Sequence, residues 1–321
     1  MKCVVLDDYQ QAAAGAADWG VLAGRVDVTF VDRHMTEADA LAELLSDAAI
    51  VVAMRERTPI TRALIERLPA LQLIVTTGMS NPSIDLVAAA DHRVVVCGTE
   101  SASTPPAELT WALILGLARR LVPEASALRD GGPWQSTVGL DLAGSTLGLV
   151  GLGEVGERVA RVGLAFGMDV AAWSANLSDE RAAAVGVRRA GSLIELLATS
   201  DVVSIHLRLS DRSSALIDAD AIATMKPTSV LINTARSGVV DQSALVRALR
   251  DRQIAGAGLD VFDLEPLPVD HPYRRLDNVL ATPHLGYVTA ANYRRYFTGA
   301  VEDIVAFLDG RPVRVLEPLT R

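Results

Sequence analysis

Short apolar runs alternate with longer segments of helical periodicity along most of this chain of 321 residues. Between residues 1 and 100, the runs typical of strands are 3–6, 26–30, 50–52, 73–76 and 94–97. Between them, apolar residues recur at helical spacing, as in 37–45 and 61–68. Alternation of strands and helices predicts a parallel sheet whose two faces are covered by helices.

A second series of the same kind begins near residue 147, with strands expected at 147–150, 170–173, 202–206, 230–233, 256–260 and 279–282. Before it, two prolines precede an apolar segment, 107–121, which is predicted to be one long helix. A last helical stretch, 289–308, is expected to return to the first series. The predicted fold class is therefore α/β, with two doubly wound parallel-sheet domains. Residues 1–100 and 289–321 form one domain, and residues 101–288 form a second domain inserted in it.

The apolar run 147–150 ends in Gly151, Gly153 and Gly156, which are spaced G-x-G-x-x-G, and a helical pattern follows at once. The first glycine permits a tight turn, the second lets a pyrophosphate approach the backbone, and the third allows close packing of helix on strand. The helix N-terminus then offers N–H groups to phosphate. An ordinary turn between strand and helix is the alternative, but the flanking pattern favours a dinucleotide site.

The composition excludes several classes of function. The net charge of −9 argues against nucleic acid as a partner. No apolar run approaches the ~20 residues that a membrane span needs, and residues 1–8 resemble a first strand rather than a signal peptide. Cys3 and Cys97 lie in apolar runs, so free thiols in a reducing cytosol are expected, without a metal site.

The type of cofactor depends on the second strand of the inserted domain, 169–173. In NAD-binding domains an acidic residue at the end of this strand bonds the ribose hydroxyl. Ser174 occupies that position here, and it would not repel the 2′-phosphate of NADP. Arg181 or Arg208 could supply a positive charge, although both arginines could instead be merely solvated. NAD and NADP both remain candidates.

Three separate segments carry candidate chemistry: 232–238 with Arg236, 258–266 with Glu265, and 282–286 with His284. An arginine at the carboxyl end of a strand can bind a carboxylate through two parallel hydrogen bonds. A histidine in a loop bounded by proline and glycine can protonate a carbonyl oxygen, and a carboxylate beside it favours the imidazolium form. A surface arginine and a structural histidine are the alternatives.

These segments resemble the D-isomer-specific 2-hydroxyacid dehydrogenase family. The supporting positions are Gly151–Gly156, His206-Leu207, Asn233–Gly238, Gly258–Glu265 and Pro283-His284, and the loop 78–85 fits the family's substrate loop. The resemblance implies a Rossmann nucleotide domain inserted in a flavodoxin-like substrate domain, often in a homodimer. It also implies hydride transfer between NAD(P)(H) and a small 2-keto or 2-hydroxy acid. A nicotinamide-sensing binding protein of the corepressor type is the alternative function.

The resemblance also implies residue roles. Arg236 binds the substrate carboxylate, His284 exchanges the proton, and Glu265 orients His284. The expected substrate loop contributes Gly78, Met79 and Ser80. The expected cofactor contacts are Thr104, Gly151, Gly153, Glu154, Val155, Gly156, Ser174, His206, Leu207, Arg208, Thr234, Ala235, Asp260 and Gly286. Ser80 and Asn81 depart from the family pattern, which often has a second glycine and an aspartate there, so a differently shaped substrate loop is expected.

Overall fold

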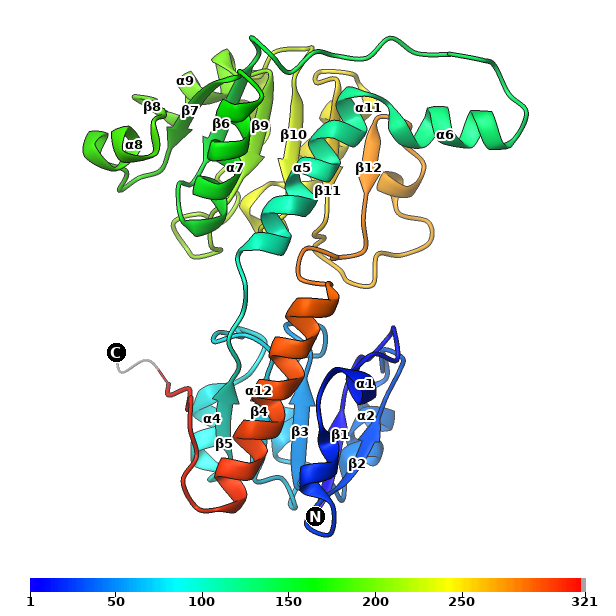
Figure 1. The fold of residues 1–321 in the computed structure, drawn as a ribbon, viewed down its shortest axis with the longest axis vertical. Helices are drawn as coiled ribbons and strands as arrows, with labels where there is room; N and C mark the ends of the chain where they lie inside the picture. Colours follow the sequence, from blue (N-terminus) through cyan, green and yellow to red (C-terminus); the bar gives the residue numbers. More distant parts are fainter. Residues whose placement is uncertain (319–321) are drawn as a thin grey trace. The chain divides into compact units, whose positions relative to one another are not determined.

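The computed structural model describes residues 1–318. Backbone contacts divide the chain into two compact units. Unit 1 contains residues 1–102 together with the described residues from 288 onward, and unit 2 is the continuous segment 103–287. The two units can be followed by colour along the chain in Figure 1.

Unit 1 is built on a five-stranded parallel sheet in the order β2-β1-β3-β4-β5. Its strands are β1 (Lys2–Val5), β2 (Asp27–Phe30), β3 (Ile50–Ala53), β4 (Leu73–Thr76) and β5 (Val95–Gly98). This order is the flavodoxin-like one, with its switch point between β1 and β3. All five strands were predicted, because strands covered on both faces give unbroken apolar runs.

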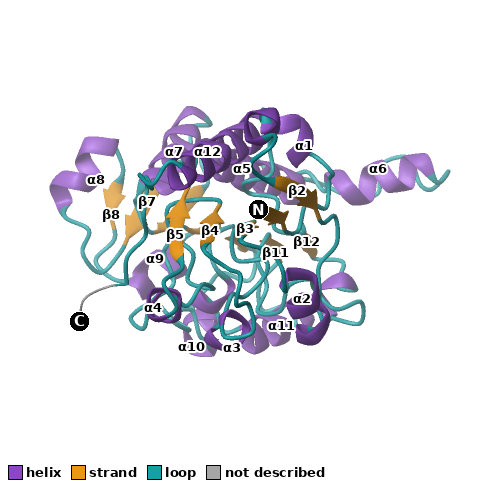
Figure 2. Ribbon diagram, turned by 90° about the horizontal axis from the view of Figure 1, so that it is seen from below, coloured by secondary structure: helices purple, strands orange, loops and turns teal. Residues whose placement is uncertain are grey.

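Helices lie on both sides of this sheet, as Figure 2 shows. They are α1 (Ala13–Ala16), α2 (Ala38–Leu45), α3 (Arg62–Ile65), α4 (Leu86–Asp91) and α12 (Ala290–Leu308), with a 3-10 turn η1 (Trp19–Leu22). The core beneath α2, α3 and α4 includes Leu41, Ile65 and Ala88. The late helix α12 belongs to unit 1, where Tyr296 and Phe297 are fully buried.

Unit 2 is built on a seven-stranded parallel sheet in the order β12-β11-β10-β9-β6-β7-β8. Its strands are β6 (Thr146–Val150), β7 (Asp169–Trp173), β8 (Arg188–Arg189), β9 (Val202–Ile205), β10 (Val230–Asn233), β11 (Gly256–Leu259) and β12 (Val279–Ala281). This is the order of a Rossmann domain, with its switch point between β6 and β9. The edge strand β8 was not predicted, because its two exposed arginines leave no apolar pattern.

Two apolar cores cover the faces of this sheet, and the helices that form them lie on opposite sides in Figure 2. The helices of unit 2 are α5 (Thr104–Ala118), α6 (Leu121–Arg129), α7 (Glu154–Ala165), α8 (Asp179–Val185), α9 (Leu193–Thr199), α10 (Ala219–Ala223) and α11 (Gln242–Arg250), with 3-10 turns η2 (Ser237–Val239) and η3 (Pro272–Arg274). The long helix predicted over 107–121 is present as α5, but it begins at Thr104 and ends at Ala118, before the predicted end. Arg120 adopts a left-handed φ of 51°, which ends α5 and separates it from α6.

The two cysteines, Cys3 and Cys97, are free and buried. Burial raises the pKa of each thiol to about 12, so both stay protonated and unreactive at neutral pH. Within residues 1–318, no helix is both long enough and apolar enough to cross a bilayer. The cytosolic location stays a prediction.

Candidate active site

The predicted chemical groups of unit 2 follow the carboxyl ends of its parallel strands. The loops 151–156, 206–208, 234–238, 260–265 and 282–286 come directly after β6, β9, β10, β11 and β12. Because the strands are parallel, these loops meet at one edge of the sheet. The crevice at the switch point of such a sheet is where ligands bind in doubly wound folds.

The glycine turn after β6 has the shape that a pyrophosphate requires. Gly151 has a φ of 106°, and a side chain there would lie 2.7 Å from the carbonyl oxygen of His206. A side chain on Gly156 would collide with the carbonyl oxygen of Gly151, whereas the space beside Gly153 is open. Gly153 is also the N-cap of α7, where Glu154 is exposed and Val155 is half-buried. These residues fit a dinucleotide phosphate.

The end of β7 lacks an acidic residue. Ser174 follows Trp173 and is half-buried. The guanidinium of Arg181 forms an ion pair with Glu157 on α7, with 2.5 Å between Arg181 Nη2 and Glu157 Oε2. Arg208, after β9, is exposed. Because Arg181 is already paired with a carboxylate, Arg208 is the stronger of the two candidates for binding a phosphate.

His206 is unsuited to acid catalysis at neutral pH. Its Nε2 lies 2.9 Å from the hydroxyl of Ser204, and burial lowers the pKa of the imidazole from 6.5 to about 4. The ring is therefore neutral in the folded protein. Since its carbonyl oxygen also faces Gly151, His206 shapes the glycine turn, and its predicted cofactor contact is not tested by this geometry.

Arg236 projects from a turn that Asn233 stabilises at the end of β10. The side chain of Asn233 donates a hydrogen bond to the carbonyl of Arg236 at 3.0 Å and accepts one from the amide of Ala235 at 3.0 Å. The guanidinium donates to the carbonyl of Ala235 at 2.7 Å. Thr234 Oγ1 lies 2.7 Å from Thr110 Oγ1, which ties the turn to α5. Arg236 therefore lies at the carboxyl end of β10, where a guanidinium can bind a carboxylate through two parallel hydrogen bonds.

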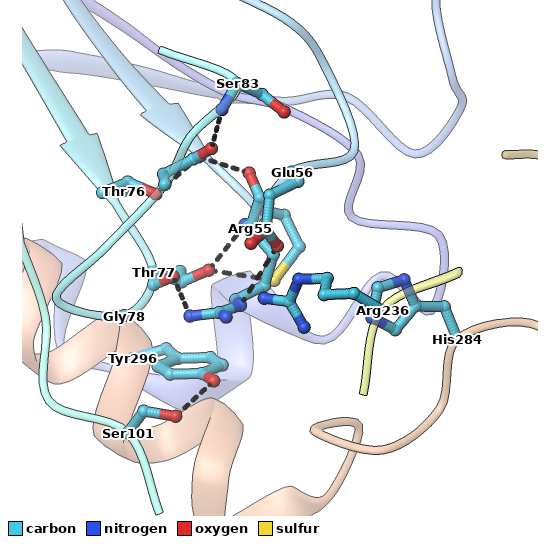
Figure 3. A network of polar contacts seen from close by, with 12 residues as sticks. Arg55, Glu56, Thr76, Thr77, Gly78, Ser83, Ser101, Arg236, His284 and Tyr296 are labelled. Carbon is cyan, nitrogen blue, oxygen red and sulfur yellow. Dashed lines mark hydrogen bonds and ion pairs between the residues drawn. The ribbon is translucent and has the colours of Figure 1, made fainter. Parts of the chain in front are cut away.

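His284 and Glu265 are brought together from two loops. His284 Nδ1 lies 2.7 Å from Glu265 Oε2, while Glu265 Oε1 accepts a hydrogen bond from the amide of Phe262 at 2.9 Å. The two side chains are only 18% and 29% exposed. The Nδ1–H group therefore donates to the carboxylate, which leaves Nε2 as the nitrogen that can exchange a proton. Figure 3 labels His284 together with Arg236.

Asp260 positions the turn that carries His284. Its buried carboxylate accepts hydrogen bonds from the hydroxyl of Thr282 at 2.6 Å and from the amides of Leu285 and Gly286 at 2.7 and 2.8 Å. Burial raises the pKa of this carboxyl group. Between these donors, His284 adopts a left-handed φ of 52°. The contact of Asp260 with nicotinamide stays a prediction. The hydrogen bonds by which Asp260 holds the turn of His284 were not predicted from the sequence.

The predicted substrate loop lies in unit 1, after β4. Gly78 has a φ of 94°, and its amide donates to the hydroxyl of Thr99 at 3.1 Å. Met79 and Ser80 are exposed. The loop also contacts Arg55, a residue that sequence reasoning missed because its neighbours in the loop are distant in sequence. Thr104, another predicted cofactor contact, is the exposed first residue of α5 in unit 2.

Known proteins of one family are similar to this chain in sequence and in structure. The family model described as "D-isomer specific 2-hydroxyacid dehydrogenase, NAD binding domain" matches residues 111–286. The chain is 37% identical over 284 residues to a glyoxylate reductase from Aeropyrum pernix, covering 86% of this chain and 81% of the relative. It is 37% identical over 308 residues to an (S)-sulfolactate dehydrogenase from Chromohalobacter salexigens, covering 95% and 97%.

Other relatives share part or all of this architecture. A D-3-phosphoglycerate dehydrogenase from Methanocaldococcus jannaschii is 35% identical over 275 residues, which are 85% of this chain but 52% of that protein. The chain thus spans about half the length of that relative. The crystal structure of a phosphoglycerate oxidoreductase from Vibrio cholerae is similar, with a TM-score of 0.92 and 36% identity, covering 97% of this chain and 99% of that one.

The lowered pKa of His206 predicts a loss of stability in acid. The unfolded state binds a proton near pH 6.5 and the folded state only near pH 4, so folding becomes less favourable as the pH falls through this window. The full effect is at most about 3 kcal/mol. His206→Gln should remove this component. Urea unfolding between pH 7 and pH 4 should show the variant losing less stability than the wild type, and parallel curves would contradict the assignment.

Proposed function

This chain belongs to the D-isomer-specific 2-hydroxyacid dehydrogenase family and is an NAD-dependent oxidoreductase, and we propose that Arg236, His284 and Glu265 carry its chemistry. The observation that supports this most strongly is the 2.7 Å contact between His284 and Glu265 at the edge where Arg236 also lies. The alternative function, a cofactor-sensing binding protein, gains no support from the relatives, which are named as enzymes.

The reaction divides its tasks among these residues. A bound nicotinamide would supply the hydride. Arg236 binds the substrate carboxylate with two parallel hydrogen bonds and thereby orients the carbonyl group. His284, as imidazolium, donates the Nε2 proton to the carbonyl oxygen as negative charge develops on it. In the reverse direction the neutral Nε2 accepts the proton of the hydroxyl group.

Glu265 and Asp260 act through His284. The carboxylate of Glu265 fixes the tautomer of the ring and stabilises its positive charge. Asp260, bonded to Thr282, Leu285 and Gly286, sets the path of the backbone on both sides of the histidine. The ring therefore needs no rearrangement when the substrate arrives, which is the property that electrostatic catalysis requires.

The substrate is a small 2-keto or 2-hydroxy acid. The names of the relatives include substrates with one acidic group, as in glyoxylate reductase, and with two, as in sulfolactate and phosphoglycerate dehydrogenases. The carboxylate at Arg236 is common to all of them. The substituent on carbon 3 of the substrate is a separate question, because Arg236, His284 and Glu265 act on the carboxylate and the carbonyl group and do not select that substituent.

Replacement of the catalytic residues should separate binding from chemistry. His284→Gln removes the acid and should lower kcat by roughly 100- to 10,000-fold, and Glu265→Gln should lower kcat less because the imidazole remains. Arg236→Lys should mainly raise KM, since it loses the two parallel hydrogen bonds. Steady-state kinetics with glyoxylate and hydroxypyruvate measures these effects. Turnover at the wild-type rate in His284→Gln would contradict the assignment.

We further propose that NADP(H) is accepted alongside NAD(H). The uncharged Ser174 at the end of β7 leaves no carboxylate to repel a 2′-phosphate, and the exposed Arg208 lies in the loop after β9. A carboxylate at this position is the usual means of excluding NADP.

Binding measurements test this proposal about the cofactor. The dissociation constants of NADPH and NADH, measured by calorimetry, should lie within about tenfold of each other. Ser174→Asp should raise the dissociation constant of NADPH by roughly 100-fold, because the new carboxylate would repel the 2′-phosphate. The dissociation constant of NADH, which lacks this phosphate, should change little. A wild-type preference for NADH of more than 100-fold would contradict the proposal.

We also propose a homodimer that forms through an exposed segment, the arm, defined as residues 121–140. The first part of the arm is α6, none of whose residues is buried. Beyond α6, Trp134 and Val138 are 77% and 97% exposed. Figure 1 shows α6 and the following loop extending away from the sheet of unit 2. Clustered exposed apolar side chains are typical of an interface, and a second copy of the chain is the partner that the family resemblance implies.

Light scattering tests the dimer. The wild type should have twice the mass of the 34.0 kDa chain, and Trp134→Asp with Val138→Asp should give a monomer because each charge would be buried in the interface. The control is Val269→Asp, an equally exposed valine of unit 2 outside the arm. A wild-type monomer, or dissociation of the control alone, would rule out the arm as the interface.

A further inference from the structure

The segment 314–316, which follows α12, pairs with the outer strand of the unit 1 sheet. It forms an isolated antiparallel bridge with β5, and Figure 1 shows it in red beside that strand. The amide of Gly98 donates a hydrogen bond to the carbonyl of Arg314 at 3.0 Å, and the amide of Leu316 donates to the carbonyl of Val96 at 2.8 Å. Since β5 is the last strand of its sheet, the segment covers backbone groups that would otherwise be open at this edge.

A buried ion pair attaches this segment to α12. The side chain of Asp303 is fully buried, and its Oδ1 lies 2.9 Å from Nη2 and 3.0 Å from Nε of Arg314. Arg314 Nη2 also donates to the carbonyl of Gly299 at 2.9 Å and lies 3.0 Å from Glu302 Oε2. A carboxylate removed from water needs a charged partner close to it. The guanidinium of Arg314 is therefore held by acceptors on successive turns of one helix.

Gly98, the last residue of β5, lies between the segment 314–316 and the predicted substrate loop. A side chain on Gly98 would lie 3.3 Å from Leu316 Cδ1 and only 2.7 Å from the carbonyl oxygen of Gly78. Because glycine has no side chain, the backbone of the loop can approach β5 closely here. A shift of the segment would therefore reach Gly78 through a single intervening residue.

Thr99 connects the same loop to α12. Its hydroxyl accepts a hydrogen bond from the amide of Gly78 at 3.1 Å, and the whole residue is buried. A side chain on Gly299 of α12 would lie 3.1 Å from Thr99 Cβ, and the carbonyl of Gly299 accepts a hydrogen bond from Arg314. Two short series of contacts thus link the guanidinium of Arg314 to Gly78, one through β5 and one through α12.

We propose that the ion pair between Asp303 and Arg314 positions the loop 78–80, and that it thereby sets how tightly the protein binds its substrate without taking part in proton transfer. Both are positioning residues, because they act on the substrate only through the loop. The effect on the substrate rests on the proposed function, in which the loop 78–80 contacts the keto acid. The effect on the loop itself lies within unit 1 and is measured separately.

Amide hydrogen exchange tests the positioning of the loop. Burial raises the pKa of the Asp303 carboxyl to about 7, although Arg314 opposes this shift, so the ionised pair is measured at pH 8. Arg314→Met removes the charge-assisted hydrogen bonds and should raise the exchange rates of the Leu316 and Gly78 amides by roughly 10- to 100-fold. The amide of Leu6, bonded to the carbonyl of Val52 at 2.9 Å, is the reference that should not change.

Two results of this measurement would overturn the proposal. Faster exchange at Leu316 with unchanged exchange at Gly78 would mean that the ion pair holds the segment but does not position the loop. An increase of equal size at Leu6, both in Arg314→Met and in the milder variant Asp303→Asn, would mean that the pair only stabilises unit 1 as a whole.

Steady-state kinetics at pH 8 tests the effect on the substrate. With glyoxylate, Arg314→Met should raise KM by roughly 10-fold and change kcat by less than about twofold, because the loop contributes equally to ground-state and transition-state binding. Arg314→Lys keeps the charge and should restore part of the affinity. The matched control is Arg311→Met, which removes an exposed arginine just before the segment and should leave KM unchanged. A lower kcat at unchanged KM would contradict the positioning role.

A double variant tests whether the two residues act as a pair. If they do, Asp303→Asn combined with Arg314→Met should exchange at Gly78 no faster than the more affected single variant, whereas multiplied effects would overturn the pairing. If no keto acid is turned over, the enzyme assignment fails, and exchange at Gly78 still decides whether the pair positions the loop. If Arg314→Met does not fold, Asp303→Asn and Arg314→Lys provide the same measurements.

Discussion

The contact between His284 Nδ1 and Glu265 Oε2, at 2.7 Å, is the interaction on which the proposed chemistry depends. A carboxylate can only accept a hydrogen bond, so the ring nitrogen that faces it must carry a proton. The other nitrogen is then the one that exchanges a proton with the substrate. The contact requires two loops from different strands to be placed accurately, and the buried carboxylate of Asp260 places one of them by accepting three hydrogen bonds from it.

The parallel sheet of unit 2 explains why groups so distant in sequence lie at one edge. From the switch point beside β6 toward β12, the strand ends carry the glycine turn, the turn of Arg236, and the loops of Glu265 and His284 in that order. An extended dinucleotide bound with its phosphates at the glycine turn would run along this edge. In unit 1 the same principle places Arg55, after β3, against the loop that follows β4.

Much of this could be predicted from the sequence, and the failures have physical reasons. Strands buried on both faces, such as β3 and β10, give apolar runs that local reasoning detects. β8 was missed because a two-residue exposed edge strand has no such pattern, and the break at Arg120 was missed because no proline or glycine marks it. His284 and Glu265 were predicted from motifs, but Arg55 was not, because its contacts with Thr77 and Asn81 arise only when the sheet brings β3 and β4 together.

The protonation state of the His284 ring tests the central claim most directly. Nitrogen-15 NMR of histidine-labelled protein, assigned with a His284→Gln variant, reports which ring nitrogen carries the proton. The account predicts that Nδ1 stays protonated in the neutral ring and that Nε2 is the nitrogen that titrates. A neutral ring protonated at Nε2, with Nδ1 as the titrating atom, would contradict the role of Glu265 and the proton transfer built on it.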